Sequence, residues 1–138
     1  MFAALTLSTD ARTTAGVLLV AVVTIEYGGT FMLRLVRGRV PATDLQKSFF
    51  RAGHAHAGVL VILALVSQLF LDAPGVPGWS KSLAAGIPIA AILVPAGFFF
   101  SAIGREVTQP NRFIALIYLG AAVLAVGVAS LGVGLLMA

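Results

Sequence analysis

The side chains best suited to catalysis or metal binding are those of His54 and His56. They are the only histidines of the chain and stand two positions apart. They lie just before a long apolar run, Val59 to Val66. An imidazole can hold a metal, exchange a proton or act as a general acid or base near neutral pH. A polar side chain inside a membrane segment is costly and usually has a partner or a ligand. We therefore expect this pair to mark the functional centre.

Helix geometry limits what the two histidines can bind. Side chains two residues apart on a helix point about 200° away from each other. His54 and His56 therefore cannot both bind one metal ion from the same side. Zinc needs three or four ligands, and the chain has no cysteine. One imidazole is enough for haem, because the porphyrin supplies the other four nitrogens. Small neighbours leave room for a flat macrocycle: Ala52, Gly53, Ala55, Ala57 and Gly58. The alternative is that both histidines are interfacial and bond to carbonyls or water.

Glu26 is the only acid well inside an apolar segment. A carboxyl group at that depth is expected to be paired or protonated. It is a candidate partner for His54, His56 or Arg34, or a candidate proton carrier. The alternative is a structural hydrogen bond between helices.

Tyr118 lies about two turns into the last apolar segment, as His56 does in the second, so both are expected roughly 10 Å deep. Its hydroxyl is a candidate donor to a molecule held opposite His56. The alternative is a packing tyrosine bonded to a carbonyl. Asn111 stands at the head of the same segment and is expected to cap it, within reach of a ligand.

The composition is that of a membrane protein. Of 138 residues, 59% are hydrophobic and only 10% are charged, with a mean hydropathy of +1.04, whereas ordinary soluble chains have roughly 25% charged residues. The net charge of +4 comes from nine basic residues near the ends of apolar runs, which favours topology signals over nucleic-acid binding. Met1 to Asp10 lacks a basic segment, so we do not expect a cleaved signal peptide.

Four apolar segments are long enough to span a bilayer, at about 20 residues each: 14–36, 49–71, 82–103 and 111–137. A turn with two prolines and two glycines separates the second from the third at residues 72–79. The fourth is rich in Gly and Ala, which predicts a close packing face. The sequence therefore predicts an all-α integral membrane protein, with residues 1–138 forming a single bundle of four transmembrane helices.

The basic residues also predict the orientation. The loops after the first and third segments and their flanks hold Arg34, Arg37, Arg39, Lys47, Arg51, Arg105 and Arg112. The opposite side has only Arg12 and Lys81. The positive-inside rule then places those two loops in the cytoplasm and both termini outside.

Two short patches resemble the styrene oxide isomerase family. Ala55-His56-Ala57-Gly58 opens the second segment, and Pro110-Asn111-Arg112 opens the fourth, with Tyr118 eight residues after Pro110. The resemblance covers the four-helix layout and these two patches, in this order and at this shared depth. It implies a homotrimer in the bacterial inner membrane, with haem b held between subunits.

The resemblance also implies residue roles. His56 would be the axial ligand, and ferric iron would act as a Lewis acid on the epoxide oxygen. A 1,2-hydride shift would then give the aldehyde, with Tyr118 placing the substrate. The sequence departs from the family at Ile62 and Pro110, where the family has an asparagine and an aspartate. The pocket is thus expected to be more apolar, and Glu26 is a candidate replacement for the missing carboxylate.

The expected function is therefore that of a haem b epoxide isomerase acting on a small hydrophobic substrate, an aryl epoxide. Its candidate catalytic residues are Tyr118, Glu26 and Asn111, and its candidate haem-binding residues are His56 and His54, with His56 on the iron. Two alternatives stay open. One is a haem protein for electron transfer or small-molecule sensing, and the other is a transport or assembly subunit without a cofactor, in which Glu26 and the histidines form a proton path.

Overall fold

The computed structural model describes residues 6–138 and is helical throughout its regular elements. The elements are α1 (Thr9–Val36), α2 (Asp44–Leu71), α3 (Gly78–Ala84), α4 (Gly86–Ser101), the 3₁₀ turn η1 (Arg112–Ile114) and α5 (Ala115–Leu136). Four helical spans within these residues are long and apolar enough to cross a membrane, with α3 and α4 forming one span together. The predicted all-α transmembrane bundle is confirmed. The expectation that no signal peptide is cleaved concerns residues 1–10, and of these residues 1–5 lie outside the described part of the chain.

The first two helices begin five residues before the apolar segments do, because polar residues cap them. Thr43 Oγ1 accepts a hydrogen bond from the Gln46 backbone N–H at 3.2 Å, and Gln46 Oε1 accepts one from the Thr43 N–H at 3.1 Å. This reciprocal capping box starts α2 at Asp44. Ser8 caps α1 in a simpler way, since its Oγ accepts from the Ala11 N–H at 3.3 Å. Hydropathy detects the apolar run and not the polar turn before it.

The third span consists of two helices that meet at Ala85 and ends at Ser101, whereas the sequence predicted one segment over 82–103. Pro88 follows the break by three residues. A proline has no backbone N–H, so Pro88 cannot donate to the Ala84 carbonyl four residues earlier. The missing bond explains a helix boundary at this position.

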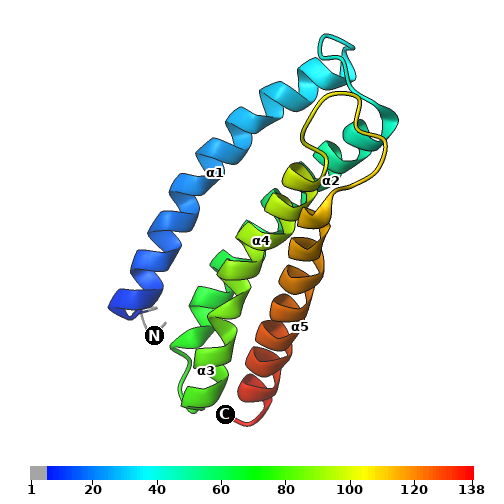
Figure 1. Cartoon of the computed structure of the whole chain (residues 1–138). Coiled ribbons are helices and arrows are strands. Elements are labelled where there is room, and N and C mark those ends of the chain that lie inside the picture. The colour runs from blue at the N-terminus through cyan, green and yellow to red at the C-terminus, as the bar shows by residue number, and fades with distance from the viewer. Residues whose placement is uncertain (1–5) are drawn as a thin grey trace.

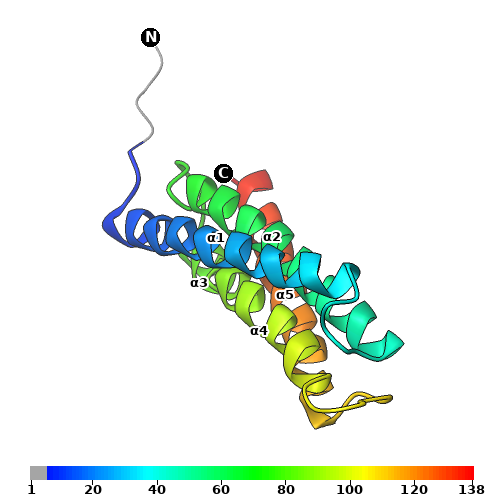
Figure 2. The same ribbon diagram turned by 90° about the horizontal axis from the view of Figure 1, so that it is seen from above.

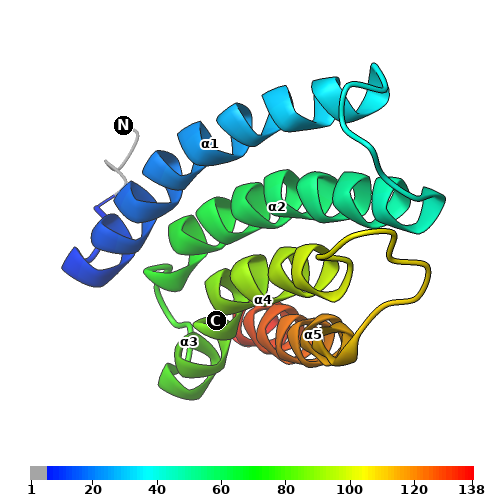
Figure 3. The same cartoon turned by 45° about the horizontal axis from the view of Figure 1, so that its top comes forward.

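The helices form a core of three and an outlying fourth. α4 packs against both α2 and α5, whereas α1 packs against α2 and against no other described helix. Figures 1 and 3 show α1 lying apart from α4, and Figure 2 shows it in front of the other helices when the bundle is seen from above. α1 begins and α5 ends at the end of the bundle that holds α3 (Figure 1).

Glycines allow α4 and α5 to approach closely. A Cβ added to Gly97 would lie 2.6 Å from Ile117 Cγ1 and 2.7 Å from the Ile117 backbone nitrogen. A Cβ on Gly120 would lie 2.6 Å from Val94 Cγ2. Gly120, Gly127 and Gly134 are all buried. The small-residue face predicted for the last segment therefore packs within the bundle.

Candidate functional site

Among the described residues, one ring nitrogen of His56 is hydrogen-bonded and the other has no partner. His56 lies on α2 with an exposed side chain, and its Nδ1 is 2.8 Å from the backbone oxygen of Ala52, one turn earlier. A carbonyl oxygen only accepts hydrogen bonds, so Nδ1 donates, and in the neutral imidazole Nε2 then holds the lone pair. Histidines that ligate metals usually hold the second nitrogen in this way. The ring also packs beside Phe98 of α4, with centroids 5.1 Å apart.

His54 faces a different helix. Its half-buried ring lies over two glycines of α1, because a Cβ added to Gly28 would lie 3.7 Å from its Nδ1 and one on Gly29 would lie 3.7 Å from its Nε2. The divergence of the two histidines predicted from the helix period is confirmed. One chain therefore does not present both imidazoles to a single ligand from the same side.

Glu26 is exposed on the surface of α1. Within residues 6–138 its carboxyl group has no hydrogen bond and no ion pair, and the salt bridge found there joins Lys47 to Asp44 at 3.3 Å. Within one chain, the structure thus joins Glu26 neither to His54 or His56 nor to Arg34. In a bilayer this carboxyl group would face lipid unless another molecule covers it.

Tyr118 lies on α5 with a side chain that is 69% exposed. Among the described residues, its hydroxyl bonds to no other group and no aromatic pair joins it to His56. It is therefore not a tyrosine packed inside its own chain. The role expected for it on a substrate remains a prediction.

Asn111 is the cap that the sequence predicts. Its Oδ1 accepts from the Phe113 N–H at 2.9 Å, its Nδ2 donates to the Phe100 oxygen at 2.9 Å, and its backbone N–H donates to the Ser101 oxygen at 2.9 Å. These bonds tie the start of η1 to the end of α4. The amide is engaged with backbone, so its direct use in catalysis would require a change of partners.

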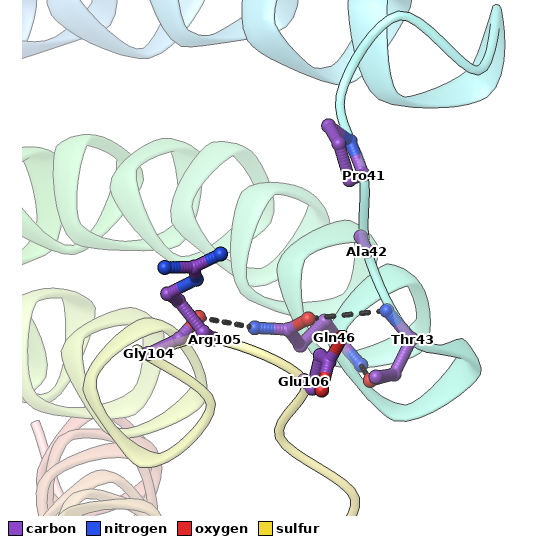
Figure 4. A pocket seen from close by; sticks show the side chains of 7 residues that line it. All are labelled: Pro41, Ala42, Thr43, Gln46, Gly104, Arg105 and Glu106. Atoms are coloured by element: carbon purple, nitrogen blue, oxygen red, sulfur yellow. Dashed lines mark hydrogen bonds between the residues drawn. The ribbon is translucent and has the colours of Figure 1, made fainter.

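A cavity of about 500 Å³ that the sequence did not predict lies between the loops at the basic end of the bundle (Figure 4). Its central side chain, Gln46, is 5% exposed and donates to the backbone oxygens of Ala102 at 3.1 Å and Gly104 at 3.0 Å. Thr43 adds a hydrogen bond from its hydroxyl to the Val107 oxygen. These contacts join the loops before α2 and after α4, which indicates a structural clamp.

Comparisons with protein-family models, with curated proteins and with solved structures find no match. The functional argument therefore depends on the residues themselves. Within residues 6–138, no three His, Cys, Asp or Glu side chains are grouped to hold a bare metal ion. A macrocycle that brings its own donors needs only one imidazole, and the free Nε2 of His56 fits that requirement.

Proposed function

We propose that this chain is a membrane-embedded haem b protein of the styrene oxide isomerase type, which isomerises an aryl epoxide to an aldehyde. The observation that supports this most directly is the state of His56. Its Nδ1 is fixed on the Ala52 carbonyl at 2.8 Å, and its Nε2 is directed to no acceptor or donor among the described residues. An axial ligand needs this combination of a fixed ring and a free nitrogen.

His56 would hold the haem iron through Nε2. When bound, ferric haem supplies a Lewis acid for the epoxide oxygen. Ala52 sets the tautomer of the imidazole, and the Phe98 ring restricts its rotation from the α4 side. The small side chains of Ala55 and Ala57 next to His56 in sequence leave space beside it. The protein therefore contributes the ligand, its orientation and an apolar environment.

The substrate side of the site would use Tyr118 and Glu26. Both are exposed at membrane depth in the single chain, as His56 is, and polar groups in hydrocarbon need partners. A second subunit that covers them would satisfy this requirement, which supports a homo-oligomer and, by the family resemblance, a trimer. Asn111 would act as a positioning residue, because its cap starts η1, the turn that leads directly into the helix that bears Tyr118.

The apolar character of the pocket is part of the proposal. Ile62, which replaces an asparagine of the family, is 62% exposed and offers no hydrogen bond. Pro110, which replaces an aspartate, precedes the Asn111 cap and has no side-chain polar group. Glu26 is then the carboxyl group available on a membrane segment to orient the epoxide. We place the protein in the bacterial inner membrane with both termini outside, as the basic residues predict.

The test is a pyridine haemochrome assay on the purified wild-type chain, His56→Ala and His54→Ala after expression with added haem. We expect stoichiometric haem in the wild type and in His54→Ala and almost none in His56→Ala. Turnover of styrene oxide to phenylacetaldehyde should follow haem content. Loss of haem only in the His54 variant would reverse the ligand assignment, and colourless wild-type protein would favour a transport or assembly role.

The absorption spectrum separates the isomerase from an electron carrier. A low-spin spectrum that azide and epoxides leave unchanged would indicate two axial histidines and electron transfer. Because His54 and His56 face different helices, two histidines on one iron would have to come from two subunits. We expect instead a spectrum that shifts on addition of azide, which requires an open coordination position.

A further inference from the structure

We propose that the chain binds a phospholipid with a phosphoethanolamine headgroup in a groove between α1 and α4, at the end of the bundle away from the basic loops. The headgroup would occupy a polar vestibule formed by the start of α1, the end of α2, and α3. One acyl chain would follow the groove into the bilayer. The headgroup end lies apart from His56, whereas Ala57, the residue after His56, lines the groove. The proposal does not depend on haem.

The groove exists because α1 packs on α2 alone and leaves the side of α4 uncovered. Its volume is about 420 Å³. Apolar side chains make up almost all of its lining, among them Val17, Leu18, Ala21, Val61, Ile92 and Pro95. From Thr14 to Ile25 the helix rises about 17 Å, close to half of the roughly 30 Å hydrocarbon core. The groove thus has the length of an acyl chain in one leaflet.

The vestibule continues the groove at its outer end. Thr14 and Pro88 line both hollows, so the two are contiguous. The vestibule has a volume of about 350 Å³ and is bordered by the side chains of Asp10, Asp72 and Lys81. Trp79 on neighbouring α3 is 46% exposed, as expected of an anchor at headgroup depth. An apolar channel with a polar mouth at this depth matches an amphiphile.

The side-chain oxygen of Gln68 indicates a ligand that carries a hydrogen-bond donor. This vestibule residue is 3% exposed, and its Nε2 donates to the Ala64 oxygen and the Ser67 Oγ, both at 3.2 Å. Among residues 6–138 no group donates to its Oε1, and no fully buried side-chain oxygen there lacks a partner. The Oε1 is therefore not fully buried, and it belongs to a residue that lines the vestibule. An ammonium group would satisfy it.

The charges around the vestibule suit a headgroup that carries both signs. Asp72 Oδ2 accepts from the Ser8 N–H at 2.6 Å, no donor among residues 6–138 bonds to Oδ1, and the exposed Asp10 also borders the vestibule. These carboxylates and Gln68 would receive the ammonium, and Lys81 would receive the phosphate. Phosphatidylcholine has no N–H to donate, and phosphatidylglycerol has no ammonium. The geometry therefore predicts selectivity for phosphatidylethanolamine.

Native mass spectrometry of the purified full-length chain tests this, with equal amounts of phosphatidylethanolamine, phosphatidylcholine and phosphatidylglycerol of the same acyl length. We expect phosphatidylethanolamine to be retained about tenfold more than either competitor, because charge-assisted hydrogen bonds contribute most of the difference. Lys81→Gln and Asp72→Asn should each remove this preference. Lys47→Gln, at the opposite end, is the matched control and should keep it.

A groove variant tests the acyl-chain half of the proposal separately. Ala21→Phe places a ring in the groove and should lower retention of all three lipids without changing the order among them. Circular dichroism and a monodisperse elution profile identify variants that fold as the wild type does. Equal retention of the three lipids by the wild type would overturn the proposal, and so would equal effects of Lys81→Gln and Lys47→Gln.

Discussion

The hydrogen bond to the Ala52 carbonyl determines which ring nitrogen of His56 can bind a ligand. A backbone oxygen has two lone pairs, so the Ala52 oxygen can accept from the His56 ring while α2 continues past it as an unbroken helix. The side chain is then satisfied at Nδ1 by its own helix, and only Nε2 needs a partner. A histidine with one nitrogen already bonded can face lipid at a lower free-energy cost than one with two unpaired nitrogens.

At the same scale, Glu26 has a testable role distinct from that of His56. If its carboxyl group orients the epoxide, Glu26→Gln should lower turnover of styrene oxide by at least about tenfold, which corresponds to the loss of one charge-assisted hydrogen bond. The haem content measured by pyridine haemochrome should not change, because among the described residues Glu26 makes no hydrogen bond or ion pair with either histidine. Thr24→Val, a nearby exposed change on α1, serves as the control. Unchanged turnover in Glu26→Gln would rule out this role.

At the scale of helices, the close approach of α4 and α5 makes Gly97 sensitive to a single methyl group. The added Cβ would lie 2.7 Å from the Ile117 backbone nitrogen, which cannot move aside as a flexible side chain would. We expect Gly97→Ala to destabilise the folded protein by about 1–3 kcal/mol, the usual cost of overpacking. Unfolding of the reconstituted protein, followed by circular dichroism in a denaturing detergent, measures this change.

Gly132 provides the matched control for that prediction. It lies on α5, and a Cβ added there would meet no atom within 4 Å. Gly132→Ala should therefore leave stability unchanged or raise it by up to about 1 kcal/mol, since alanine has the higher helix propensity. Equal destabilisation by the two substitutions would show that glycine in these helices matters for another reason than close packing.

Comparison of the elements with the sequence shows which features local patterns can predict. The four spans follow from hydropathy, the divergence of His54 and His56 follows from 100° per residue, and the Asn111 cap follows from its place before an apolar run. The Gln46 clamp could not be predicted, because its acceptors, the Ala102 and Gly104 oxygens, are 56 and 58 residues away in sequence. Such contacts depend on how the helices are arranged.

The same limit applies to the site. The sequence indicated that His56, Glu26 and Tyr118 are polar groups at membrane depth, and all three are exposed in the single chain. It could not predict that Glu26 bonds to neither histidine among the described residues or that α1 leaves a groove beside α4, because both depend on the position of α1. A pattern within one helix carries no information about the gap between two others.

At the scale of the whole molecule, α1 is the helix least held by its own chain. Only 6% of its membrane-spanning part is buried, against 39% for the span from Gly78 to Ser101. The rest of α1 must be covered by lipid or by another subunit, since its exposed face is apolar along most of its length. This helix bears both Glu26 and one wall of the lipid groove, so a partner that packs on α1 would influence both proposed sites.

The orientation of the molecule gives a prediction that uses its lack of cysteine. The loops flanked by most of the basic residues should face the cytoplasm, and the turn between α2 and α3 should face outward with the two termini. Gln109→Cys and Pro74→Cys place one thiol at each end of the bundle, both at exposed positions. A membrane-impermeant maleimide applied to intact cells should label Pro74→Cys and leave Gln109→Cys unlabelled until the membrane is opened.

This orientation also determines which leaflet supplies the lipid to the groove. The vestibule lies at the same end as Pro74, since Asp72 and Lys81 flank that turn, so labelling of Pro74→Cys from outside assigns the groove to the outer leaflet. Both thiols should react in opened membranes, which controls for folding and reagent access. The opposite labelling pattern would contradict the positive-inside assignment and would move the proposed lipid site to the inner leaflet. It would leave the assignment of His56 unchanged, because that assignment depends on contacts within α2 and α4.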